Sequence, residues 1–204
     1  MGTLVIDMFV TLDGVAQGPG APDEDRGGGF EHGGWQAPFF GEEDESGRII
    51  GENIERMDAL LLGRKTYEIF ASYWPQAPKD LDIATKLNAV PKYVASRTLT
   101  SADWTNSTVI DGDAADQVAK LKESHNEIHV IGSIDLAQTL LGNELVDRIN
   151  LWIYPVVLGT GKRLFSDGAV PTALRLVQSA TFPNGSVLLV YETTGKPTYG
   201  NLGE

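Results

Sequence analysis

The sequence predicts an α/β fold, in which buried strands alternate with amphipathic helices. The first indication is segment 58–74, where a short apolar run is followed by a glycine and then by apolar residues at helical spacing. The second is segment 127–141, which repeats the order strand, glycine, helix. The third is segment 174–194, whose two apolar halves flank Pro183-Asn-Gly185 and predict a C-terminal hairpin.

Length and composition are those of one soluble domain. The chain has 204 residues, of which 42% are hydrophobic and 22% charged. It has no cysteine, which excludes disulfides and thiolate chemistry. No apolar run approaches the roughly 20 residues that a membrane span needs, and the N-terminus lacks the basic start of a secretory signal. We therefore expect a cytoplasmic protein.

The charge distribution restricts the kinds of partner. A net charge of −12 argues against non-specific binding to nucleic acid, which needs a basic surface. Segment 23–55 has ten acidic residues against two arginines, whereas segment 63–97 has six basic residues against three acidic ones. An anionic ligand is therefore expected on the second segment.

The N-terminal segment 3–12 is rich in branched and aromatic residues and predicts a buried strand. It ends at Asp13-Gly14, where glycine tolerates positive φ and aspartate can accept hydrogen bonds from the backbone beyond it. Asp13 is either a turn carboxylate or a candidate catalytic group, and its position leaves both interpretations open.

Residues 17–40 hold seven glycines and three prolines, which argue against regular structure over more than twenty residues. Loops of this length are functional lids or disordered segments. The aromatic residues Trp35, Phe39 and Phe40 favour a lid, because a solvated linker has little use for them. We expect Trp35 or Phe39 to lie near a substrate; a passive loop is the alternative.

A helix is predicted over residues 42–57, where apolar residues recur at helical spacing. Acidic residues gather near its start, where they suit the helix dipole. Simple solvation is the expected state of most acidic residues on such a helix.

Segment 58–74 contains a candidate anion site. Its strand ends at Gly63, which lets the backbone turn, and the first amides of the following helix are left unpaired at the carboxyl edge of the strand. Arg64 and Lys65 add positive charge there, and Thr66 adds a hydroxyl. The alternative is a simple turn with solvated cations, because single motifs of this kind are often false positives.

Two further strand ends carry polar groups. The strand predicted over 91–97 ends in Ser96 and Arg97, a hydroxyl and a guanidinium that together suit a phosphate monoester. The strand at 127–132 ends in Gly132-Ser133, which places a second set of helical amides at a sheet edge. The intervening segments predict, in order, a short helical or irregular connector at 83–88, a strand at 104–109 and a helix at 114–123.

Segment 145–158 predicts a strand that is apolar on both faces, with Trp152 and Tyr154 on one of them. Such a face is covered either by the same chain or by a second subunit. Lys162 and Arg163 follow, and solvation is the expected state of such a pair.

The remaining tryptophans and histidines suggest no chemistry. Trp74, Trp104 and Trp152 are expected to be structural. His129 lies inside a predicted strand and is expected to be packed in the core. The three histidines do not follow a known metal-binding spacing.

Several of these segments resemble one family. Residues 61–68 (LLGRKTYE), followed by Tyr73-Trp-Pro75, resemble the dihydrofolate reductase fold. Residues 147–149 and 155–165 (DRI and PVVLGTGKRLF) are similar to the RibD C-terminal domain, the reductase half of the riboflavin-biosynthesis deaminase-reductase. The resemblance implies a three-layer α/β/α fold of dihydrofolate reductase type, with a mixed central sheet and a C-terminal hairpin, as a single domain over residues 1–204.

The resemblance also implies an activity, which is the NADPH-dependent reduction of a small planar nitrogen heterocycle. The substrate would be pyrimidine- or pterin-like, such as 5-amino-6-(5-phosphoribosylamino)uracil or dihydrofolate, and the protein a homodimer. Ser96 and Arg97 would hold the 2′-phosphate, which favours NADPH over NADH. The cofactor-binding residues implied are Ala16, Gly63, Arg64, Lys65, Thr66, Ser96, Arg97, Ile131, Gly132, Ser133, Ile134 and Leu136. The resemblance also implies a catalytic or substrate-binding carboxylate early on the helix 42–57, where Asp44 and Glu45 are the candidates and the spacing does not choose between them; simple solvation is the alternative for both.

Two other classes stay open. One is a nucleotide- or flavin-binding protein of the same fold without reductase activity, for which FMN is a weaker candidate than NADPH. The other is a scaffold that keeps only the fold. The chain has no cysteine and therefore lacks the P-C-x-x-C motif that zinc deaminases combine with H-x-E, so it does not contain the other half of the bifunctional enzyme.

Overall fold

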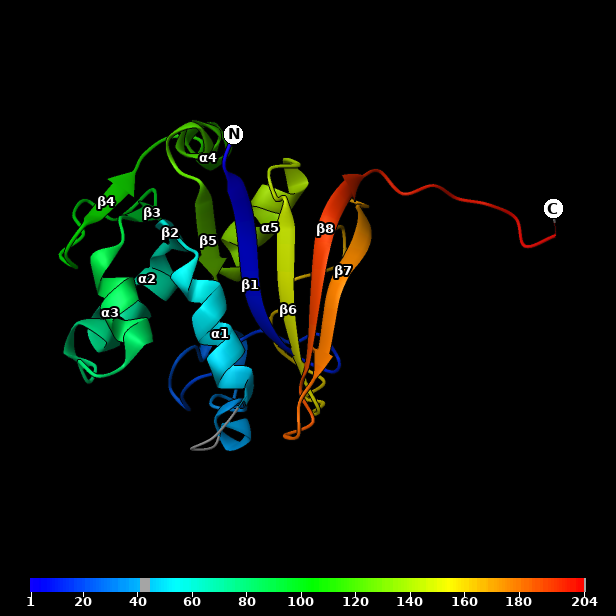
Figure 1. The fold of residues 1–204 in the computed structure, drawn as a ribbon, viewed down its shortest axis with the longest axis horizontal. Helices are drawn as coiled ribbons and strands as arrows, with labels where there is room; N and C mark the ends of the chain where they lie inside the picture. Colours follow the sequence, from blue (N-terminus) through cyan, green and yellow to red (C-terminus); the bar gives the residue numbers. More distant parts are fainter. Residues whose placement is uncertain (41–44, 204) are drawn as a thin grey trace.

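The computed structural model describes residues 1–40 and 45–203, which form a mixed sheet with helices on both faces (Figure 1). The strands are β1 Thr3–Thr11, β2 Ala59–Gly63, β3 Lys92–Ala95, β4 Ser107–Ile110, β5 Glu127–Ile131, β6 Arg148–Tyr154, β7 Ala173–Thr181 and β8 Val187–Gly195. The α-helices are α1 Glu45–Glu55, α2 Arg64–Tyr73, α3 Asp82–Ala89, α4 Ala114–Ser124 and α5 Ile134–Gly142. Short 3₁₀ turns are η1 Gly27–Gly29, η2 Ala37–Phe39 and η3 Trp74–Gln76.

The eight strands are ordered β4-β3-β2-β5-β1-β6-β8-β7. The first six in this order pair in parallel, and β8 and β7 add an antiparallel hairpin at one edge. The six parallel strands therefore all point the same way. Their carboxyl ends, and the loops that follow them, form what is called here the carboxyl edge of the sheet. This arrangement confirms the predicted α/β class and the C-terminal hairpin.

The helices form the two outer layers. Helices α4 and α5 pack on the face to which β1 turns Leu4 and Ile6, and α1, α2 and α3 pack on the opposite face. The sequence of β2 is continuously apolar because both faces of this strand are buried. Leu61 faces the layer of α4 and α5, while Leu60 and Leu62 face the layer of α1, α2 and α3. A strand buried on both faces has no place for a polar side chain.

The aromatic face of β6 is covered by the same chain. Trp152 is 1% exposed and stacks on Phe182 of the hairpin connection, with ring centroids 5.6 Å apart. Tyr154 is contacted by the rings of Trp35 and Phe39 from the long loop, at 5.7 and 5.4 Å. A second subunit is therefore not what covers this face.

The long loop over residues 17–40 is packed and hydrogen-bonded, and it contains the turns η1 and η2 where no regular structure was predicted. The buried side chain of Gln17 organises it. Its Nε2 donates to the carbonyl oxygens of Asp25 and Gly27 at 3.1 and 2.9 Å, and its Oε1 accepts from the amide of Lys162 at 3.0 Å. The Trp35 indole donates to the Gln17 carbonyl at 2.9 Å.

Other boundaries differ from the prediction by a few residues. The expected connector at 83–88 is the helix α3, and β3 ends at Ala95, before Ser96 and Arg97. Strand β6 is half the length of the predicted 145–158 strand. Residues 196–203 have no helix or strand, and Figure 1 shows them leading away from the sheet.

Candidate active site

Two strand–helix turns meet at the carboxyl edge of the sheet. Because β2 and β5 are parallel neighbours, α2 and α5 begin side by side. Gly63, at the first turn, has φ −74° and ψ 156°, which any residue adopts. The prediction that this turn needs the backbone freedom of a glycine is therefore wrong.

The second turn does use an unusual backbone. Gly132 has φ +59° and Ser133 has φ +51°, both in the left-handed region that costs a non-glycine residue roughly 1–2 kcal/mol. Two hydrogen bonds hold the serine there: its Oγ accepts from the amide of Gly63 at 3.0 Å, and its own amide donates to Thr66 Oγ1 at 3.1 Å. The serine therefore keeps a tight turn, and it ties the two turns together.

The amides at these helix starts are available to a ligand. Neither α2 nor α5 has a side chain that caps its N-terminus among the described residues. In contrast, Asp113 caps α4 by accepting from the amides of Ala115 and Asp116 at 2.8 and 3.2 Å. Uncapped helix N-termini bind anions, because the free amides and the helix dipole both favour negative charge.

Asp25 of the long loop lies between two lysines near these turns. Its carboxylate is 2.7 Å from Lys162 Nζ and 3.8 Å from Lys65 Nζ, and it accepts from the amide of Gly27 at 2.8 Å. Burial acts to raise the pKa of Asp25, but these partners outweigh it and lower the pKa. Lys162 is therefore paired, so its expected solvated state is wrong.

Of the other predicted phosphate-binding groups, Arg97 is exposed and has no ion-pair partner in residues 1–40 or 45–203. Ser96 Oγ accepts from the amides of Thr98 and Leu99 at 3.2 and 2.9 Å, and so holds the turn that carries Arg97. Arg64 forms an exposed ion pair with the carboxylate four residues ahead, at 2.9 Å.

Four predicted cofactor residues remain to be placed: Ala16, Ile131, Ile134 and Leu136. Ile131 is the last residue of β5, and Ile134 is the first residue of α5. Ala16 is buried and donates its amide to the carbonyl of Lys162 at 2.8 Å. Leu136 points into the core beneath α5.

Asp13 has the environment of a turn carboxylate. Its carboxylate accepts from the Thr11 hydroxyl at 2.6 Å and from the amides of Leu158 and Gly159 at 3.2 and 2.8 Å. Arg163 Nε donates to its carbonyl at 3.0 Å, so the expected solvated state of this arginine is wrong as well. The Thr11 hydrogen bond is the largest of the effects that lower the pKa of Asp13 to about 2.

Of the two carboxylates predicted near the start of the first helix, Glu45 contributes little to a site. Glu45 is exposed at the start of α1, with its carboxylate 3.6 Å from Arg48, and does not line the cavity between that helix and the sheet. Asp44 lies outside the described residues.

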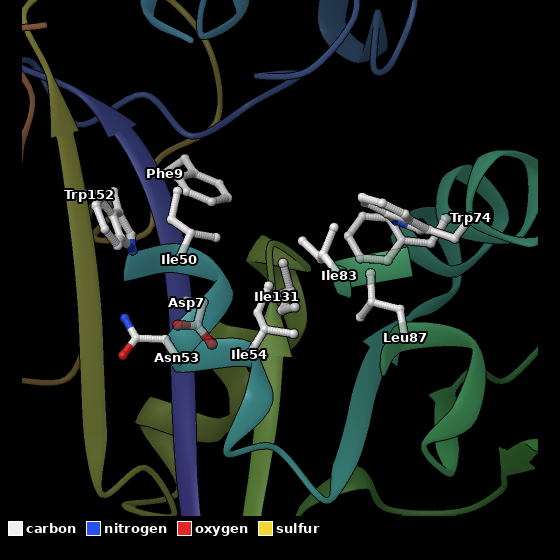
Figure 2. A pocket seen from close by; sticks show the side chains of 11 residues that line it. Asp7, Phe9, Ile50, Asn53, Ile54, Trp74, Ile83, Leu87, Ile131 and Trp152 are labelled. Atoms are coloured by element: carbon white, nitrogen blue, oxygen red, sulfur yellow. The ribbon is translucent and has the colours of Figure 1, made fainter. Parts of the chain in front are cut away.

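A cavity of about 90 Å³, measured as the space open to the centre of a water molecule, separates α1 from the sheet. Its lining residues are Asp7, Phe9, Ile50, Asn53, Ile54, Phe70, Trp74, Ile83, Leu87, Ile131 and Trp152 (Figure 2). Trp74 and Trp152, expected to be structural only, are thus walls of the cavity. Trp35 and Phe39 are not among its lining residues.

Asp7, in the middle of β1, belongs to a buried ionic cluster. Its carboxylate accepts from Asn150 Nδ2 at 2.8 Å and is 2.6 Å from His129 Nδ1, while His129 Nε2 is 3.0 Å from Glu127 Oε1. Burial alone would lower the pKa of His129, but the two carboxylates raise it from 6.5 to about 9. His129 is buried as predicted, and its environment makes it an imidazolium that donates from both nitrogens.

Of the residues that line the cavity, sequence reasoning had singled out only Ile131 as part of a site, and it missed Asp7. One signal was present, since Asp7 is the only charged residue in the strand Thr3–Thr11. A carboxylate inside an otherwise apolar strand needs a partner or a function. The apolar lining residues gave no such signal, because they follow the same periodicity as the rest of the core.

Two other kinds of site are absent from the part of the chain that the structure describes. No helix within residues 1–40 or 45–203 has the length and hydropathy needed to cross a membrane. Over those same ranges, no three histidine, aspartate or glutamate side chains are grouped so as to hold a metal ion.

Comparison with known proteins identifies the family. The model of the RibD C-terminal domain matches residues 2–188, and the chain belongs to this family. Two proteins of Bacillus subtilis (strain 168) are similar in sequence. YyaP is 31% identical over 199 residues, covering 94% of this chain and 95% of YyaP, and YwjB is 27% identical over 180 residues, covering 87% and 91%.

Solved structures share the fold. A putative riboflavin biosynthesis protein from Shewanella sp. PV-4 superposes with a TM-score of 0.71 at 20% identity, over 94% of this chain and 99% of that one. A deaminase/5-amino-6-(5-phosphoribosylamino)uracil reductase from Thermotoga maritima has a TM-score of 0.62 at 14% identity, over 95% of this chain and 57% of that one. These similarities confirm the predicted α/β fold of the reductase type.

Proposed function

We propose that the protein is an NADPH-dependent reductase of a small planar nitrogen heterocycle, of the pyrimidine or pterin kind. One observation carries the proposal. Ile131 ends the strand that leads into the turn Gly132-Ser133, and its side chain also lines the cavity. A cofactor held at the turn would therefore lie next to a ring held in the cavity.

The residues at the carboxyl edge fit such a cofactor. The uncapped starts of α2 and α5 and the left-handed turn at Gly132-Ser133 suit a pyrophosphate. Arg97, a free and exposed guanidinium, suits the 2′-phosphate that distinguishes NADPH from NADH. The bound cofactor supplies a hydride, and the chain orients the two reactants and keeps water out through apolar and aromatic walls.

The family supports the reaction class. The Thermotoga maritima protein is named as a uracil-derivative reductase as well as a deaminase, and this chain spans about 57% of its length. A protein from Corynebacterium diphtheriae with a TM-score of 0.63 is named pyrimidine reductase-like. Both names concern heterocycles of the size that the proposal requires.

Titration with NADPH, NADH and FMN tests the proposal, with intrinsic tryptophan fluorescence as the signal. Trp74 and Trp152 line the cavity and therefore report on ligands there. We expect NADPH to bind most tightly. Tight binding of FMN with no response to NADPH would instead support a flavin-binding protein of the same fold.

Replacing Arg97 with alanine is expected to weaken NADPH binding by roughly 10- to 100-fold, because a charge-assisted hydrogen bond is worth about 1.5–3 kcal/mol. NADH affinity should change much less, since NADH has no 2′-phosphate. The measurement is the dissociation constant of each cofactor, with Arg48→Ala on α1 as a control that removes an equally exposed arginine. Equal losses for both cofactors would rule out this role for Arg97.

We also propose that the protein is a homodimer and that the contact lies at β7. This strand ends the sheet, its outer edge is unpaired among the described strands, and Leu174, Leu176 and Val177 are exposed on it. A long apolar edge strand readily pairs with another strand. A second copy of the same edge, antiparallel to the first, would continue the sheet.

Sedimentation at micromolar concentration is expected to give twice the 22.0 kDa chain mass. Leu176→Glu, at a side chain that is 49% exposed, should give a folded monomer, because it places like charges opposite each other across the contact. Leu12→Glu alters an exposed leucine away from β7 and should leave the dimer intact. A wild-type monomer at this concentration would refute the proposal.

A further inference from the structure

The cavity between α1 and the sheet contains two polar side chains in an otherwise apolar and aromatic wall. Asp7 comes from β1 and Asn53 from α1, and they are 5% and 7% exposed. In the view of Figure 2 both lie at the end of the cavity near Trp152, away from Trp74. Buried polar groups are costly unless they have partners, so the partners of these two are informative.

Asn53 has an unused donor. Its Oδ1 accepts from the Arg56 guanidinium, which fixes the orientation of the amide. Its Nδ2 is buried and has no hydrogen-bond partner among the residues that the structure describes. An unpaired buried donor is expensive to keep, and a ligand acceptor in the cavity would satisfy it.

Asp7 has unused acceptor capacity. Each of its carboxylate oxygens takes one hydrogen bond, from His129 at 2.6 Å and from Asn150 at 2.8 Å. A carboxylate oxygen has two acceptor positions, so each retains one. Asp7 also lines the cavity, so these positions place a hydrogen-bond acceptor beside a bound ligand.

One chain of charged groups orients both side chains. Arg56, which holds Asn53, has its Nε 3.6 Å from Glu127 Oε1. The same oxygen is 3.0 Å from His129 Nε2, and His129 holds Asp7. Asn53, the donor, and Asp7, the acceptor, are therefore held at the two ends of a single network. Such an arrangement suits recognition of one rigid group.

We propose that Asp7 and Asn53 together recognise one edge of the heterocycle, with Asp7 accepting from a ring N–H and Asn53 donating to a neighbouring carbonyl. The inference rests on the proposed function and deepens it by naming the chemistry of the ring. The ligand class is a cyclic amide or imide, in which an N–H stands next to a C=O, as in uracils and oxopterins. Phe9 and Trp152 provide aromatic surface beside this edge.

Two probes isolate the ring N–H groups: 5,6-diaminouracil and its 1,3-dimethyl analogue. They are titrated by calorimetry against the full chain, with and without NADP⁺. The wild type is expected to bind diaminouracil about tenfold more tightly or better, since methylation removes the hydrogen that Asp7 accepts. Asp7→Asn, which keeps the shape but not the charge, should abolish this preference.

Asn53→Leu separates recognition from structure. It should weaken diaminouracil binding about tenfold, while the melting temperature stays the same or rises, because a buried unpaired donor is removed. A purely structural asparagine would give the opposite, a lower melting temperature with unchanged binding. Ser107→Ala is the matched control: Ser107 Oγ in β4 is likewise buried and unpaired among the described residues, but does not line the cavity.

Three results would overturn the inference. They are equal binding of both probes by the wild type, unchanged diaminouracil affinity in Asn53→Leu, and no binding of either probe by the wild type. In the last case the NADPH titration decides separately whether the reductase proposal stands. NADPH binding without uracil binding would refute only the ring chemistry proposed here.

Discussion

Replacing Trp152 with glutamate is expected to prevent folding and to give no clean monomer. The indole is 1% exposed, stacks on Phe182 and lies 6.4 Å from Phe9, so a glutamate would be buried there without a partner. An unpaired buried charge costs several kcal/mol, a large part of the about 5–15 kcal/mol that stabilises a typical domain. Urea unfolding followed by circular dichroism should show no cooperative transition.

The control introduces the same charge at the surface. Leu176→Glu changes an exposed residue of β7 and should unfold cooperatively, at a midpoint close to that of the wild type measured under conditions where both are monomeric. If Trp152→Glu were instead a well-folded monomer, Trp152 would belong to a subunit interface. The same chain would then cover the aromatic face of β6 only in part.

Replacing His129 with leucine is expected to cost on the order of 3–5 kcal/mol at pH 6, because Asp7 would remain as a buried carboxylate without its cation. The His129 ring is completely buried, so solvent cannot replace it. The free energy of unfolding in urea measures this loss. His32→Leu, at an exposed histidine, should change it by a few tenths of a kcal/mol.

The same histidine makes stability depend on pH. Its folded pKa of about 9 lies above the unfolded value of 6.5, so its contribution is fully present below pH 6.5 and is lost as pH rises through 9. The difference between wild type and His129→Leu should therefore shrink over this range. A difference that does not vary with pH would mean that His129 is neutral in the folded protein.

Comparison at equal pH is necessary because Lys92 acts in the opposite direction. Its ammonium group is buried and donates to the carbonyl oxygens of Leu87 and Val90, both at 2.8 Å. Burial lowers the pKa of Lys92 from 10.5 to about 8. A lysine with a depressed folded pKa gains relative stability as pH rises from 8 to 10.5, and this contribution cancels between wild type and variant.

Periodicity was sufficient for most of the fold. The apolar run that became β2 and the helical spacing that became α2 are local patterns, and the tertiary structure agrees with them. The order of strands and helices then identified the α/β class. Local patterns did not predict the backbone conformation of the turns. Gly63 has an ordinary conformation, whereas Ser133 has a left-handed one that its hydrogen bonds to Gly63 and Thr66 maintain.

The candidate site was harder to predict, because it depends on contacts between distant segments. The two strand–helix turns could be located, since each follows a strand directly. The cavity could not, since its walls come from β1, α1, α2, α3, β5 and β6 and its aromatic residues have the same spacing as core residues. Trp35 and Phe39 were expected there because they lie in a long loop, but they pack against Tyr154.

The position of Asp25 between Lys65 and Lys162 has a consequence for any anion that approaches these lysines. Asp25 is tethered to the same chain, so it competes with that anion at an effective concentration of about millimolar or more, whatever the composition of the solution. A free anion such as phosphate displaces Asp25 only if it outcompetes a carboxylate that is present at this effective concentration. A ligand anchored elsewhere on the protein would gain the same intramolecular advantage as Asp25, so the arrangement would favour large anions held at several points over small free ones.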